Sequence, residues 1–196
     1  APKLPATALV NPVKAANAAV GYGLSLRRQV APTIVERSPL LKGSGGLGIR
    51  VLLFDVPLDD LRAGGRAAGG SINDAFLSAM IGGLRRYHEH FGVRVDEIPI
   101  SIPVSTRTGA DTLGGNKFAG VKLIAPLGEP DPARRIELLR AQVRAAREEP
   151  ALAWLDVAAK VLDKLPVAAL ADIVFNATSS ADAQMSNIPG VGWEAY

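Results

Sequence analysis

Residues 71–91, SINDAFLSAMIGGLRRYHEHF, predict the best-formed helix of this chain. Ser71 is a suitable N-cap, and Asp74 three residues later completes the pattern of a capping box. Asn73 has no structural duty in this pattern, and it stands at a helix N-terminus, where free backbone N–H groups can bind anionic or carbonyl groups. The helical spacing of apolar and small residues predicts one buried face. The residues expected on that face are Ile72, Phe76, Ala79, Met80, Gly83, Leu84 and Tyr87.

Predicted strands and helices alternate on both sides of this helix. We expect strands at 49–56, 98–104 and 117–127, a short strand or extended turn at 184–188, and further helices at 12–30, 57–68, 132–149, 152–165 and 167–177. Pro99 and Pro103 favour an edge or bulged position for the strand 98–104, because proline cannot donate to a sheet ladder. The alternation indicates an α/β domain, a mixed sheet flanked by helices. Residues 1–48 are expected to form an N-terminal helix and a linker, and residues 49–196 the folded domain.

Composition limits the class of protein. The chain has 196 residues, 48% of them hydrophobic and 21% charged, enough for a real core. It has no cysteine, which excludes disulfides, a thiol nucleophile and cysteine-based zinc sites. The formal charge of +3 comes from interleaved basic and acidic residues, which gives little support for nucleic-acid binding. We expect a cytoplasmic protein with no metal and no nucleic-acid partner.

Residues that could act in catalysis or bind a ligand lie in separate parts of the sequence. His88 and His90 point about 200° apart on a helix, so they cannot share a metal, and we expect both to be exposed. No serine-hydrolase elbow or P-loop is present, and GSGGLG (43–48) precedes a predicted strand rather than following one, which favours a flexible loop over a phosphate cradle. What remains is a set of polar residues at predicted strand ends and helix starts. They are Asn73, Asp74, Ser105, Arg107, Asn116, Ser186 and Asn187.

Five segments together resemble one family. The matching segments are AGGSINDAFLSAMIGGLRRY (68–87), IPISIPVSTR (98–107), LGGNKFAGV (113–121), DPARRIELLR (131–140) and MSNIPG (185–190). Their order resembles the bacterial wax ester synthase/diacylglycerol acyltransferase family across roughly residues 35–190. PVSTR followed by GN is also similar to the wider superfamily of CoA-dependent acyltransferases. The resemblance implies a chloramphenicol acetyltransferase-like lobe, here an incomplete C-terminal lobe, with residues 1–48 ending in the interlobe linker.

The resemblance also implies an activity. Family members transfer a fatty acyl group from acyl-CoA to diacylglycerol or a long-chain alcohol, with no cofactor beyond that substrate. The general base is the second histidine of an HHxxxDG motif, which this sequence lacks. We therefore expect the base on an N-terminal lobe outside this chain, on a separate polypeptide or lost, and we expect the chain alone to be inactive.

Roles for individual residues follow from the same motifs. Asn73 and Asp74 match the family's ND pair; Asn73 would orient a substrate oxygen and Asp74 would remain a cap. Arg107 would pair with the aspartate of the missing motif and hold the geometry of the site. Ser105 and Asn116 would face the substrate tunnel from strand ends. Ser186 and Asn187 would donate hydrogen bonds to the thioester oxygen or to CoA.

Two other readings of the chain stay open. One is a related carrier- or CoA-dependent acyltransferase or condensation domain. The other is a non-catalytic lipid-surface module that has lost its base. Because the implied substrates are lipids, the helix at 12–30 could meet the inner membrane or lipid droplets through Lys14, Arg27 and Arg28, although packing against the other lobe is favoured.

Overall fold

The computed structural model describes residues 20, 35–42, 48–105, 118–148, 166–168, 171 and 179–188. The helices are α2 (Leu58–Ala67), α3 (Ile72–His90) and α4 (Pro132–Arg147), and the strands are β1 (Glu97–Ser105), β2 (Phe118–Pro126) and β3 (Ala183–Gln184). These bounds confirm five predicted elements to within two residues, whereas β3 shares only Gln184 with the segment predicted at 184–188. The predicted helices at 12–30, 152–165 and 167–177 fall almost wholly outside the described residues.

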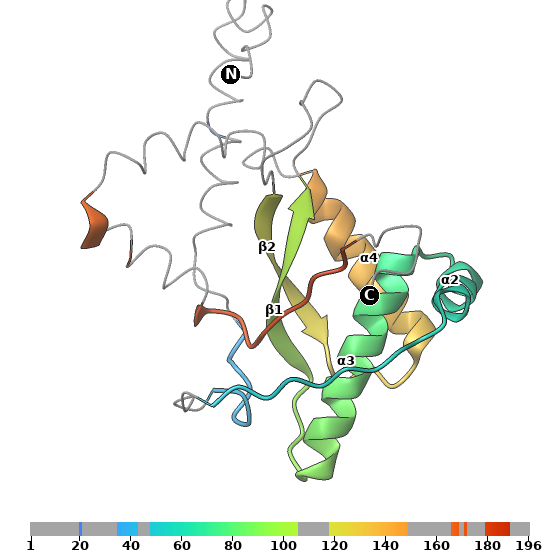
Figure 1. Cartoon of the computed structure of the whole chain (residues 1–196), viewed down its shortest axis with the longest axis horizontal. Coiled ribbons are helices and arrows are strands. Elements are labelled where there is room, and N and C mark those ends of the chain that lie inside the picture. The colour runs from blue at the N-terminus through green and yellow to red at the C-terminus, as the bar shows by residue number, and fades with distance from the viewer. Residues whose placement is uncertain are drawn as a thin grey trace, which may run out of the picture.

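The sheet is mixed, as predicted. Its order is β2-β1-β3, and β1 pairs antiparallel with β2 and parallel with β3. Helices α3 and α4 pack beside one another, and α2 packs on α3 (Figure 1). The chain is therefore a mixed α/β fold. No helix among the described residues is long and apolar enough to cross a bilayer.

The predicted edge position of β1 is wrong, because β1 is the central strand. Pro99 stands opposite Ile124, and its carbonyl turns away from β2 to accept the Asp182 N–H at 2.8 Å. Backbone groups of successive residues point to opposite sides of a strand, so Pro103, four residues after Pro99, takes the same orientation as Pro99. β2 therefore needs no N–H donor at either proline, and both prolines are compatible with a central strand.

The core lies between one sheet face and the helices. Every second residue of β1, from Ile98 to Val104, is buried, and so are the facing residues of β2 from Ala119 to Ala125. On α4 the predicted inward residues are all buried: Ile136, Leu139, Val143 and Ala146.

The predicted inward face of α3 is only partly right: Phe76 and Leu84 pack against the core, but other predicted residues do not. Met80 and Tyr87 are exposed, at 38% and 46% of their surface, whereas Leu77 and Ile81 are buried against the sheet. The buried stripe also carries Asp74, Ser78 and His88, and each of these polar side chains has a hydrogen-bond partner. Because those partners come from the cap, the α4 entrance and residue 38, a pattern in the helix alone could not reveal them.

The predicted strand at 49–56 is absent. This segment has no regular structure, and its apolar side chains are exposed, with Leu53 at 93%. A strand needs a partner for its backbone groups. In the described sheet both sides of β1 are occupied, and the outer edge of β2 is covered at Ile124, where the Gln142 carboxamide bonds the N–H at 2.8 Å and the C=O at 2.7 Å.

Candidate functional site

One end of the sheet gathers the predicted site residues that the structure describes. Ser105 ends β1, and β2 begins at Phe118, so the segment 106–117 leaves and re-enters at that end. Arg107 and Asn116 belong to this segment and lie outside the described residues. Ser186 and Asn187 follow β3, which runs parallel to β1, so they leave toward the same end, and both are exposed.

Asn73 approaches from the helix layer. α3 runs opposite to β1, to which a short turn connects it, so the first turn of α3 lies toward the end where β1 finishes (Figure 1). The Asn73 side chain is half-buried. Topology thus places Asn73, Ser105, Ser186 and Asn187 at one end of the domain.

The capping box predicted for α3 is present. The Asp74 carboxylate accepts hydrogen bonds from the Ser71 N–H and from the Ser71 hydroxyl, each at 2.8 Å, and the Ser71 oxygen accepts the Asp74 N–H at 3.3 Å. Asp74 is only 5% exposed. Its carboxylate is committed to holding the helix start, which leaves Asn73 as the side chain of the ND pair available to a ligand.

A cavity of about 350 Å³ opens beside Asn73. α3 contributes its first turn to the lining, and α4 contributes its last two turns. The lining residues are Ser71, Asn73, Asp74, Arg140, Val143, Arg144, Arg147 and Glu148. The three arginines were not among the predicted site residues. A signal was available: each directly follows a buried residue of α4, so all three flank the buried stripe.

Arg135 fixes how α4 lies against α3. Arg135 is 6% exposed, and its guanidinium donates to the carbonyl oxygens of Glu129 at 2.7 Å, Pro130 at 3.0 Å and Ser78 at 3.3 Å. Burial, and then the charge of Arg85, lower the pKa of Arg135. The bond to Ser78 connects α4 to α3, and the bonds to Glu129 and Pro130 hold the segment that leads into α4.

His88 contradicts the expectation of exposure, whereas His90 is exposed as expected. His88 is 2% exposed, with Nδ1 at 2.7 Å from the Leu84 carbonyl oxygen and Nε2 at 2.6 Å from the Ser38 hydroxyl. The carbonyl can only accept, so Nδ1 carries a proton. Ser38 is itself fully buried, and its N–H donates to Asp182 at 2.6 Å. This buried pair ties residues 35–42 to the end of α3.

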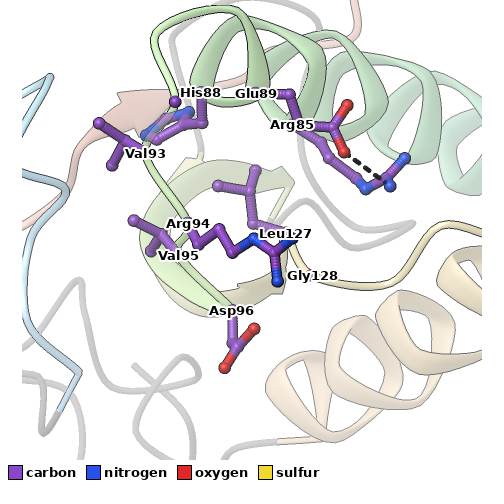
Figure 2. Close-up of a pocket in the computed structure, with 10 residues that line it drawn as sticks. Arg85, His88, Glu89, Val93, Arg94, Val95, Asp96, Leu127 and Gly128 are labelled. Carbon is purple, nitrogen blue, oxygen red and sulfur yellow. Dashed lines mark ion pairs between the residues drawn. The ribbon is translucent and has the colours of Figure 1, made fainter.

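A larger cavity, of about 570 Å³, lies at the other end of α3 (Figure 2). Arg85 and Glu89 line it as an ion pair at 2.7 Å, and Arg94 and Asp96 lie further along the wall. Its charges balance, and none of the predicted site residues lines it. The smaller cavity beside Asn73 is therefore the better candidate site. Among the residues with described positions, no cluster of metal-ligating side chains occurs.

Comparison with known proteins agrees with the motifs. Residues 114–196 match the family model described as WS/DGAT C-terminal domain. Over 189 residues, 96% of this chain and 38% of the relative, the chain is 41% identical to a putative diacylglycerol O-acyltransferase of Mycobacterium tuberculosis strain H37Rv. Another of that strain is 30% identical over 145 residues, 71% of this chain and 32% of that relative. No solved structure matches the chain.

These matches define the class as that of the acyltransferases. The chain belongs to the wax ester synthase/diacylglycerol acyltransferase family. It spans about 38% of the length of the first two relatives.

Proposed function

We propose that this chain is the C-terminal-lobe part of an O-acyltransferase that moves a fatty acyl group from acyl-CoA to diacylglycerol or a long-chain alcohol. The observation that carries this is the 41% identity over 96% of the chain to a relative with diacylglycerol O-acyltransferase in its name. The clustering of Asn73, Ser105, Ser186 and Asn187 at one end of the sheet supports it. The lobe would be chloramphenicol acetyltransferase-like, with residues 1–48 as helix and linker and residues 49–196 as the domain.

The reaction needs a base that this chain does not contain. The second histidine of HHxxxDG, on an N-terminal lobe, would take the proton from the acceptor hydroxyl. The hydroxyl oxygen would then attack the thioester carbonyl, a C–O bond would form, and the C–S bond would break. The CoA thiolate would leave and take up the proton from the histidine. Acyl-CoA is the substrate, and no further cofactor takes part in these steps.

The residues of this chain would bind and orient. Ser186 and Asn187, exposed beyond β3, would donate hydrogen bonds to the thioester oxygen or to CoA. Ser105 and Asn116 would line the tunnel from the strand ends, and Arg107 would pair with the aspartate of HHxxxDG. The protein would work in the cytoplasm, at the periphery of the inner membrane or lipid droplets where its lipid substrates reside.

Reconstitution tests the proposal directly. The chain would be coexpressed with an N-terminal-lobe polypeptide that carries HHxxxDG, and CoA release from palmitoyl-CoA would be followed with diolein or hexadecanol as acceptor. We expect release only when both polypeptides are present, and none when the second histidine of HHxxxDG is replaced by alanine. Equal CoA release from the histidine variant, or none from the complete pair, would refute the proposed function.

A further inference from the structure

Three arginines lie on one side of α4 and line the cavity beside Asn73. Arg140, Arg144 and Arg147 are all exposed, and they flank the buried stripe of the helix. Among the described residues, four other arginines make ion pairs, whereas no described carboxylate lies within ion-pair distance of these three. Arg140 donates one N–H to the carbonyl oxygen of Gly69, which holds its side chain at the mouth of the cavity.

The acids around this cavity only partly neutralise the arginines. Two carboxylates, Asp74 and Glu148, line it together with the three arginines. The Asp74 carboxylate is occupied by two hydrogen bonds from Ser71. Glu148 is exposed at the end of α4. Three guanidinium groups against two carboxylates leave the lining with a net positive charge, beside the Asn73 amide.

A guanidinium group binds phosphate through paired N–H donors and keeps its charge at any physiological pH. At about 350 Å³ the cavity is near the lower end of the range of small-molecule sites, so it would hold only part of a large substrate. We propose that Arg140, Arg144 and Arg147 bind the phosphate groups of the acyl-CoA substrate. This assignment rests on the proposed function, because it takes CoA as the ligand.

The assignment also decides which oxygen Asn73 contacts. The long pantetheine arm of CoA holds the thioester far from the phosphates. A phosphate beside Arg144 therefore puts the thioester outside this cavity, toward the end of β1 and the segment after β3. Asn73, in the same cavity as Arg144, then donates its amide N–H to a phosphate oxygen. Asn73 is a substrate-binding residue here, and the groups that polarise the thioester lie elsewhere.

Binding of CoA and its fragments to the purified chain tests the assignment by calorimetry. CoA and adenosine 3′,5′-bisphosphate should bind, and pantetheine, which has no phosphate, should bind much more weakly. Arg144→Gln should weaken CoA binding by about tenfold or more, as expected for the loss of a hydrogen bond to a charged group. Arg86→Gln, which removes an exposed arginine of α3 outside the cavity, should leave it unchanged.

Equal affinity of the wild type and Arg144→Gln for CoA would overturn the assignment, and so would pantetheine binding as tightly as CoA, or no CoA binding at all. The other possible source of phosphate is a lipid headgroup, which is tested by comparing binding to vesicles of phosphatidylglycerol and of phosphatidylcholine. If Arg144→Gln lost binding to the anionic vesicles but kept CoA, the ligand would be a lipid headgroup. The proposed function fails separately: CoA could bind at Arg144 although the reconstituted pair transfers no acyl group.

Discussion

Replacing Gly65 by alanine should destabilise the junction that positions the ND pair. Gly65 is buried in α2, and a Cβ there would meet the carbonyl oxygen of Ser71 at 2.6 Å and its carbon at 3.0 Å. Both are backbone atoms of the residue that caps α3. The Ser71 oxygen accepts the Ala75 N–H at 3.0 Å, so it cannot retreat without weakening the first turn of α3.

The neighbouring Gly64 supplies a matched control. It lies in the same helix, and a Cβ there would meet nothing within 4 Å. Alanine is favoured over glycine in a helix by about 1 kcal/mol, so Gly64→Ala should raise the free energy of unfolding by about that amount. Gly65→Ala gains the same propensity but adds an overpacking cost of about 1–3 kcal/mol. The two variants should therefore differ by about 1–3 kcal/mol, with Gly65→Ala the less stable.

Urea unfolding followed by circular dichroism measures this difference. With a slope of about 2 kcal/mol per molar urea, the midpoints of the two variants should lie about 0.5–1.5 M apart. Gly65→Ala should also weaken CoA binding if the shift of Ser71 carries Asn73 with it. If both substitutions raised the midpoint equally, the close approach of α2 to the cap of α3 would be refuted.

Three further predictions concern other parts of the described structure. Gln142→Ala should cost about 1–3 kcal/mol, because it leaves the backbone groups of Ile124 unpaired at the edge of β2, and amide hydrogen exchange at Ile124 should accelerate; unchanged exchange would contradict the contact. Burial lowers the pKa of Lys122, so the charged side chain opposes folding at pH values below that pKa. Lys122→Met should therefore raise the free energy of unfolding at neutral pH, and this gain, measured by urea titration, should shrink as the pH rises toward about 10. A gain that does not depend on pH would exclude this cause. Asp182→Ala removes the acceptor of Arg37 Nε at 2.9 Å and of the Ser38 N–H at 2.6 Å, so residues 35–42 should become sensitive to limited proteolysis, and unaltered cleavage there would show that they are held by other contacts.

The sequence predicted the elements well wherever the signal is local. The cap at Ser71 and Asp74, the four buried positions of α4 and the bounds of β1 and β2 all depend on residues close together in the chain, and all are confirmed. The roles proposed for Arg107 and Asn116 stay predictions, because both residues lie outside the described part.

The failures share one cause, which is that the deciding partner is distant in sequence. α3 carries apolar residues on more than one face, and its position against the sheet, together with the Ser38 hydroxyl beside His88, decides which face is buried. Residues 49–56 have the composition of a strand, but no described strand pairs with them.

By itself, the sequence determined the family, the order of the described helices and strands, and the candidate polar residues. It could do so because motifs and periodicity depend on residues that are close together in the chain. Only the tertiary structure decided that α4 delivers Arg140, Arg144 and Arg147 to the cavity that contains Asn73, more than sixty positions earlier. The helical period sets which residues share a face of α4, but the packing of α4 on α3 and the sheet, held by the buried Arg135, sets what that face meets.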